Sequence, residues 1–176
     1  LRFCVVEADG IRSLRIDAAT GAPAEDVQTP FPGAAPNVIY ATVSADGREL
    51  AYATAATEIY TAAPGGMPVR RYDGRELPDD VVSIPADLHY VDGQLYFSDL
   101  GRDAVMRLAG SNAAEPVFDR GRAEARGYAD AFYECKSFQA GAGRLVLPNN
   151  GKVVEFDLRG DAPVRTCDHA RANAAL

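Results

Sequence analysis

The sequence predicts an all-β fold assembled from repeated, four-stranded antiparallel sheets. Three observations carry this prediction. Short runs of alternating apolar residues recur along the chain, turn-forming glycines separate them, and the same order of elements returns at intervals of somewhat under fifty residues. The 176 residues are 47% hydrophobic and 24% charged. That balance supplies a packed core and argues against wholesale disorder.

The repeat is defined by a fixed succession of elements. Each unit has a turn glycine, an alternating apolar strand, a polar loop, a second apolar strand and a Pro-Val step. The prolines of these steps lie 48 and 47 residues apart. The glycines are Gly47, Gly93 and Gly143, and the prolines are Pro68, Pro116 and Pro163. If the repeat is structural, the three glycines must occupy equivalent turns.

Each complete unit is expected to form a meander of four strands. A four-stranded sheet cannot bury both faces alone, so the units must stack on one another. Units of this length with four strands are typical of β-propeller blades. A β-sandwich is the alternative, but it would not explain the shared register. The expected units are 1–35, 36–82, 86–120 and 136–168, and the first of them lacks its opening strand and turn glycine.

Three segments depart from the repeat. Residues 71–86 form a connector rich in charge and proline, and residues 119–135 form an insertion whose Ala, Glu and Arg favour a short helix. The Ala-rich tail, 169–176, is a poor strand. Three complete blades and a partial one do not close a ring of four to eight blades in the usual way. We therefore expect a part of a longer protein, a chain that pairs with a second polypeptide, or a four-bladed ring with irregular closure.

The composition of the chain limits the kinds of partner that we expect it to bind. The formal net charge of −7 disfavours binding to a phosphate backbone, and no apolar run approaches the length of a membrane span. The opening residues, LRFCVVEADG, resemble the middle of a strand rather than a signal peptide. Three cysteines are too few for a disulfide scaffold, and Cys167 with His169 is an isolated pair rather than a zinc motif.

The blade sequences resemble known propeller families. The stretch SADGRELAYATAATEIYTAAPGGMPVRRY is similar to the repeat of TolB-type propellers. The stretch DGQLYFSDLGRDAVMRL is similar to blades of the gluconolactonase/senescence-marker, NHL and YWTD propellers. The resemblance covers about residues 40–167 and implies a propeller, with a location outside the cytoplasm slightly favoured. Tryptophan is absent, so neither a WD dipeptide nor a Trp-docking blade occurs.

The propeller topology predicts one functional face. The loops that join second to third strands gather there with the connectors between blades, and ligands of such folds usually bind at that end. These loops and connectors contain the acidic residues Glu7, Asp103, Asp79 and Asp80. The candidate binding residues on or beside them are Asp9, Glu58, Asp87, Asp99, Arg102, Asn149, Asn150 and Lys152, and the candidate catalytic residue is His89. By default, Glu58 and Asp99 are expected to be solvated residues at loop tips.

The lactonase-like resemblance implies a divalent cation, Ca²⁺ or Mg²⁺, held by Glu, Asn and Asp near the channel, with a metal-bound water as nucleophile. An inward-facing His89 could act as a base or ligand, or it could be a hydrogen-bonded structural residue. The Asn-Asn-Gly of residues 149–151 also suits a tight hairpin turn.

Two functional hypotheses remain open at this point. The first, which we favour, is a binding or assembly module whose partner is another polypeptide or the rest of its own propeller. The second is a metal-dependent lactonase or lyase with its site at the channel face. The enzyme would be favoured if four side chains converged in one coordination sphere, namely Asp87, His89, Asp99 and Asn149. No cofactor or metal site is specified by the sequence.

Overall fold

A computed structural model describes residues 2–78, 81–125, 138–141, 143–149, 152–158 and 163–168. This part of the chain is almost entirely β-structure. Outside the strands it has one short helix, α1 (Arg120–Ala125), and one 3₁₀ turn, η1 (Gly74–Glu76). The prediction of an all-β fold is confirmed.

The strands form four separate antiparallel sheets, each in sequence order. The first sheet contains β1 (Arg2–Val6), β2 (Gly10–Ile16) and β3 (Pro23–Pro30). The second contains β4 (Val38–Val43), β5 (Leu50–Thr54), β6 (Glu58–Ala62) and β7 (Val69–Asp73). The third contains β8 (Pro85–Val91), β9 (Gln94–Asp99), β10 (Ala104–Gly110) and β11 (Ala113–Asp119). The fourth contains β12 (Gln139–Gly141), β13 (Arg144–Asn149), β14 (Lys152–Asp157) and β15 (Pro163–Asp168). Three complete meanders and one partial meander are the predicted blades.

The three repeat glycines occupy equivalent turns. Gly47, Gly93 and Gly143 each lie between the first and second strands of their sheets, with φ of 74°, 77° and 72°. This left-handed region favours glycine, because it has no Cβ to collide with the following carbonyl. The shared geometry shows that the periodicity read from the sequence is a structural repeat.

The core lies between neighbouring sheets, because alternate residues of one strand face opposite ways. In β5, Tyr52 packs with Ile11 of the first sheet, whereas Ala51 and Ala53 face Phe97 of the third sheet. A third cluster joins the third sheet to the fourth and contains Val91, Tyr96, Val105, Phe118, Phe138, Leu145, Leu147 and Val154. Full burial of each large apolar side chain contributes about 1.5–3 kcal/mol. Stacking therefore stabilises sheets that could not be stable alone.

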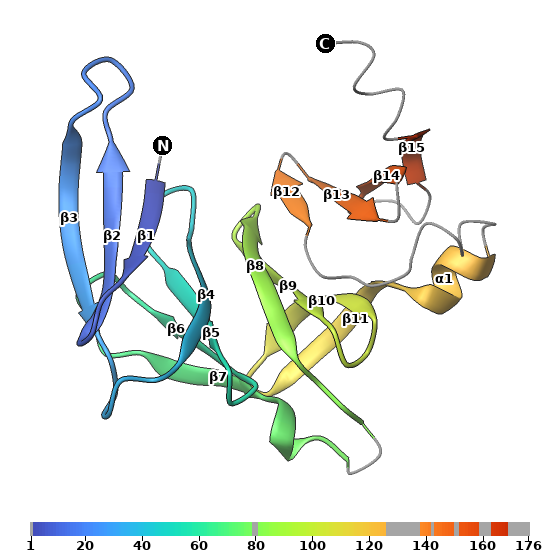
Figure 1. Ribbon diagram of the computed structural model, residues 1–176, viewed down its shortest axis with the longest axis horizontal. Helices are drawn as coiled ribbons and strands as arrows, with labels where there is room; N and C mark the ends of the chain where they lie inside the picture. Colours follow the sequence, from blue (N-terminus) through green and yellow to red (C-terminus); the bar gives the residue numbers. More distant parts are fainter. Residues whose placement is uncertain are drawn as a thin grey trace.

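The sheets are arranged as a fan in chain order, with the first and fourth at its two ends (Figure 1). Among the described residues, the hydrophobic clusters join only neighbours in that order. Phe3 and Val5, on β1 at one end, are exposed. The fan thus has an apolar end surface of the kind that another blade covers in a propeller.

The segments outside the repeat have little regular structure. The connector after β7 begins with η1, where the Asp73 carboxylate accepts a hydrogen bond from Arg75 N. The short helix expected within 119–135 is present as α1, and residues 126–137 lie outside the described residues. The tail, 169–176, lies outside them as well.

Candidate functional site

The topology places two kinds of segment at one end of each sheet. In a four-stranded meander, the loop after the second strand and the connector after the fourth lie at the same end, because successive strands are antiparallel. In the third sheet this loop is residues 100–103, and the connector that reaches the sheet is residues 74–84. We call this end of the molecule the loop face.

Asp99 is the anchor of the loop face. Its side chain is fully buried at the end of β9, so the expectation of a solvated loop tip is wrong. Asp99 Oδ2 accepts a hydrogen bond from Ser83 Oγ at 2.7 Å, and Oδ1 accepts one from Ile84 N at 2.9 Å. Oδ1 also accepts from the backbone amides of the following turn, Gly101 N at 3.1 Å and Arg102 N at 3.3 Å. One carboxylate therefore ties the connector to the turn.

An apolar patch sits on this anchored scaffold. Val82, Ile84 and Leu100 are exposed, and Leu100 N donates a hydrogen bond to Ile84 O at 3.0 Å. Gly101 lies so close to the connector that a Cβ there would come within 2.5 Å of Val82 O, so only glycine fits. We call these three residues the Val82–Ile84–Leu100 patch.

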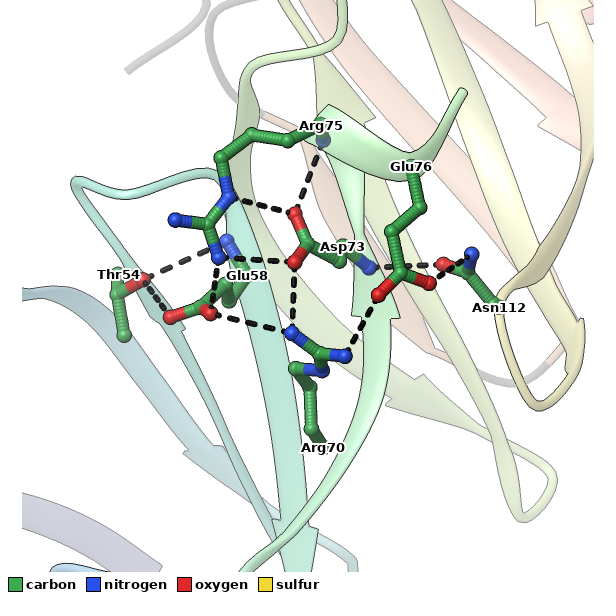
Figure 2. A network of polar contacts seen from close by, with 7 residues as sticks. All are labelled: Thr54, Glu58, Arg70, Asp73, Arg75, Glu76 and Asn112. Atoms are coloured by element: carbon green, nitrogen blue, oxygen red, sulfur yellow. Dashed lines mark hydrogen bonds and ion pairs between the residues drawn. The ribbon is translucent and has the colours of Figure 1, made fainter. Parts of the chain in front are cut away.

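Glu58 is the second candidate whose carboxylate is bound by other side chains of the protein (Figure 2). Its side chain is only 15% exposed at the start of β6, so the expectation of a solvated tip is wrong here too. Glu58 Oε1 accepts a hydrogen bond from Arg75 Nη2 at 2.5 Å and lies 3.7 Å from Arg70 Nη1. Glu58 is therefore part of an ionic network.

The rest of this network links the second and third sheets, and the sequence reading missed it. Asp73 accepts hydrogen bonds from Arg70 and Arg75, and the bond from Arg75 lowers the pKa of Asp73. Asn112, in the turn between β10 and β11, accepts from Asp73 N at 2.9 Å and donates to Glu76 at 2.8 Å (Figure 2). The Arg70-Arg71-Tyr72-Asp73-Gly74-Arg75 run is the only sequence signal for it.

Asp87 and His89 lie together on β8. His89 Nε2 is 3.2 Å from Asp87 Oδ1, although the approach lacks hydrogen-bond geometry and Nε2 has no other partner among the described residues. Asp87 Oδ2 accepts a hydrogen bond from Phe138 N at 3.0 Å, and the His89 ring packs edge-on against Phe138 at 4.7 Å. Both side chains therefore lie against the start of the fourth sheet.

Of the remaining candidates, Arg102 lies beside Asp99 and the others lie apart. Asp9, in the loop before β2, accepts a hydrogen bond from Gln28. Arg102 Nε is 3.5 Å from Asp99 Oδ2. Asn149 pairs with Lys152 across β13 and β14, the register of a hairpin whose two connecting residues, Asn150 and Gly151, lie outside the described residues. Asp79 and Asp80 lie outside them too. The candidate residues whose contacts are described form separate sets rather than one site.

Metal ligands and membrane-spanning helices are two further features that bear on function. Where the structure describes side chains, three or more His, Cys, Asp or Glu residues do not gather in a way that could hold a metal ion. Within the described ranges, no helix has the length and hydrophobicity that a membrane crossing requires.

No family model matches the chain, and no curated protein matches it in sequence. Solved structures do match. The structure of U3-55K is 17% identical over 92% of this chain and 50% of that chain, with a TM-score of 0.55. The RRP9 WD40 repeats give the same identity and TM-score over 92% and 49% of the two chains. The computationally designed Ika8 protein is 11% identical over 94% and 48%, with a TM-score of 0.52.

These likenesses show the fold. WD40 repeats are propeller blades, so the four sheets are blades of a β-propeller. This chain spans about half the length of each of these structures. The finer resemblance to TolB-type, gluconolactonase, NHL or YWTD propellers stays a prediction.

Proposed function

We propose that this chain is a β-propeller binding module whose loop face holds a protein partner. The observation that carries the proposal is the Val82–Ile84–Leu100 patch. Exposed apolar side chains that cluster on a surface mark interaction sites more often than single ones do. Here three of them lie on two segments, the connector and the turn after β9, that a backbone hydrogen bond from Leu100 to Ile84 joins.

Rigidity supports the same conclusion. An interface gains affinity when its anchoring side chains are fixed before binding, because less conformational entropy is lost. The patch residues sit on backbone that Asp99 and Ser83 tie together, and Tyr72 Oη lies 2.9 Å from Ser83 Oγ beneath them. The hydrogen bonds therefore present the patch in one geometry.

The ends of the fan support assembly as the second part of this function. The exposed Phe3 and Val5 form an apolar surface on the first sheet. A further blade, supplied by the same protein or by another polypeptide, would bury this surface as the existing blades bury theirs. The partners we propose are thus a protein on the loop face and neighbouring blades at the ends.

The matched substitutions Val82→Asp and Val69→Asp test the loop-face proposal. The two valines have nearly the same exposure, 61% and 60%, but Val69 lies at the start of β7, outside the patch. Complexes formed by the full protein in its native cells would be compared by cross-linking and native mass spectrometry. Val82→Asp should remove a partner that Val69→Asp retains, with equal thermal stability. Retention of every partner by Val82→Asp would refute the proposal.

The enzyme hypothesis has less support from the geometry. Its candidates include Asp99, whose carboxylate is fully occupied, and the Asp87–His89 pair, which packs against Phe138. Hydrolysis of a small lactone in the presence of Ca²⁺ or Mg²⁺, abolished by His89→Asn, would revive it. We propose the binding function as the better supported of the two.

A further inference from the structure

A pocket of about 230 Å³ lies between the second and third sheets, and neither functional hypothesis uses it. Its polar lining includes Glu49, Thr61 and Arg71 from the second sheet and Tyr90 from the third. Leu95 and Leu108 supply an apolar part of the wall. The pocket therefore combines opposite charges, hydroxyl groups and apolar surface in one space.

Arg71 reaches the pocket through a β-bulge. In β7, Tyr72 pairs with Ile59 and Arg70 pairs with Tyr60, so Arg71 is the extra residue between them. The fourth strands of the third and fourth sheets and the last strand of the first sheet also have a bulge, but theirs directly follows the repeated proline, at Val117, Val164 and Ala24. A bulge redirects a side chain. Only the second of the four sheets places an arginine at that position.

A second bulge lies at the same pocket, on the third sheet. In β10, Leu108 pairs with Ala114 and Gly110 pairs with Ala113, which leaves Ala109 as the extra residue. Ala109 and Gly110 both line the pocket, and a Cβ at Gly110 would meet nothing within 4 Å. The strand thus has an irregularity where it lines the cavity, and the missing Cβ of Gly110 leaves room there.

The protein satisfies the polar groups of the pocket only in part. Among the described residues, neither Glu49 nor Arg71 has an ion-pair partner, although both line the same cavity. Arg71 Nε and Tyr90 Oη are buried without a well-formed hydrogen bond. Burial raises the pKa of Tyr90 above its ordinary value of 10, and the charge of the Glu49 carboxylate and a hydrogen bond to it act in the same direction. Buried polar groups without partners are costly unless water or a ligand satisfies them.

The charged residues are also held in place from behind. Glu49 N donates to Ser44 Oγ at 3.0 Å, and Glu49 O accepts from Ser44 N at 2.8 Å. Asn112 N donates to the carbonyl oxygen of Arg71 at 2.6 Å, which fixes the bulge from the third sheet. The backbone that carries both charged side chains is therefore fixed before any ligand arrives.

We infer that this pocket binds a small zwitterion, of the class of a free α-amino acid, whose carboxylate pairs with Arg71 and whose ammonium group pairs with Glu49. A guanidinium binds a carboxylate through paired charge-assisted hydrogen bonds, and Tyr90 and Thr61 offer further hydroxyl groups. The volume holds about eight water molecules at about 30 Å³ each, which suits a molecule of that many non-hydrogen atoms.

The charge balance selects a zwitterion over a simple ion. An anion that binds Arg71 would also face the Glu49 carboxylate, and a cation that binds Glu49 would face the guanidinium. A like charge in a partly desolvated pocket opposes binding, whereas a ligand with both charges meets two opposite partners. Acetate and ethylammonium should consequently bind less well than an amino acid that contains both groups.

The test is a titration of the isotopically labelled full chain, followed by NMR. L-Serine should cause saturable shifts of the Gly93 and Gly110 amides, which line the pocket. Acetate and ethylammonium should bind at least tenfold more weakly. Arg71→Gln and Glu49→Gln should each weaken serine binding at least tenfold, since a charged hydrogen-bonding partner is lost. Arg48→Gln, which removes the same charge next to Glu49 at a highly exposed side chain, should leave it unchanged.

Three results would overturn the inference. They are the absence of saturable shifts at the pocket amides, acetate or ethylammonium binding as tightly as serine, and equal weakening by Arg48→Gln and Arg71→Gln. A Tyr90→Phe variant, which keeps the ring and removes only the hydroxyl, guards against loss through misfolding. It should retain the fold and bind serine more weakly. Val82→Asp should bind serine as the wild type does. The serine-binding inference can therefore be refuted without refuting the loop-face proposal, and the reverse is also true.

Discussion

Replacement of Asp99 with alanine should be among the most destabilising single changes in the chain. The Asp99 carboxylate is fully buried, and four donors from two segments point at it. Alanine removes the acceptor and leaves the donors in place. Ser83 is buried, and the backbone bonds from Ile84, Gly101 and Arg102 are all partly buried.

The magnitude follows from the two bonds that join Asp99 to the connector, because the Gly101 and Arg102 amides belong to the turn that directly follows Asp99. A hydrogen bond to a charged acceptor is worth about 1.5–3 kcal/mol, so the bonds from Ser83 Oγ and Ile84 N together represent about 3–6 kcal/mol. Ser83 Oγ retains Tyr72 Oη as a neighbour, which favours the lower half of that range. Asp99→Asn should cost only about 1–2 kcal/mol, because two bonds to a charged acceptor become bonds to a neutral amide. The amide oxygen still accepts from the backbone, and the amide nitrogen can donate to Ser83 Oγ.

Urea denaturation followed by circular dichroism measures these free energies of unfolding. Glu115→Ala is the control, since it removes one carboxylate from an exposed pair with Arg107 on the same sheet. An exposed pair contributes about 0–1 kcal/mol, so the free energy of unfolding of this variant should differ from that of the wild type by no more than that amount. If the free energies of unfolding of Asp99→Ala and Glu115→Ala agree within about 1 kcal/mol, Asp99 does not anchor the loop face.

Three further predictions concern titration, reactivity and association. The Arg75 hydrogen bonds hold the pKa of Asp73 below its ordinary 3.8, so the stability this carboxylate contributes is complete above that pH and is lost as pH falls through the lowered value. Below pH 3.8, the free energy of unfolding of Asp73→Asn should therefore depend less steeply on pH than that of the wild type. The same pH dependence in both proteins would contradict the network. Burial raises the pKa of Cys4 to about 11, so iodoacetamide should modify it slowly at pH 8 in the folded chain and rapidly in urea, as peptide mass spectrometry would show. Finally, the chain alone should self-associate through the end surface with Phe3 and Val5, and light scattering that finds a stable monomer at all concentrations would speak against an uncovered blade face.

The blades could be predicted because their determinants are local and repeated. Alternation in β5, β9 and β13 decides which residues face each neighbour, and the turn glycines Gly47, Gly93 and Gly143 fix where each meander begins. These signals need only a few adjacent residues to act. The partial first sheet was also predictable, since a missing turn glycine leaves one strand fewer.

The contacts of the loop face could not be predicted in the same way. The sequence pattern places Asp99 and Glu58 at the tips of loops, whereas they are the last residue of β9 and the first residue of β6. Their contacts come from Ser83 and Arg75, which belong to a connector outside the repeat. The fourth-strand bulge is another case. Its position at Arg71 rather than beside the proline changes which side chain faces the next sheet, and periodicity alone contains no trace of that shift.

The likeness to WD40 repeats separates what builds a blade from what a blade does. This chain has no tryptophan and so no WD dipeptide, yet its sheets match that fold. The blade geometry here therefore rests on alternation, turn glycines and stacking, none of which requires the signature residues. Positions that all four units share are thus explained by folding alone. Positions at which one unit departs from the others, such as the displaced bulge at Arg71 and the anchored connector at Ser83 and Ile84, have no such explanation. Both proposed binding sites lie at departures of this kind, and the strength of each proposal depends on that asymmetry rather than on any shared motif.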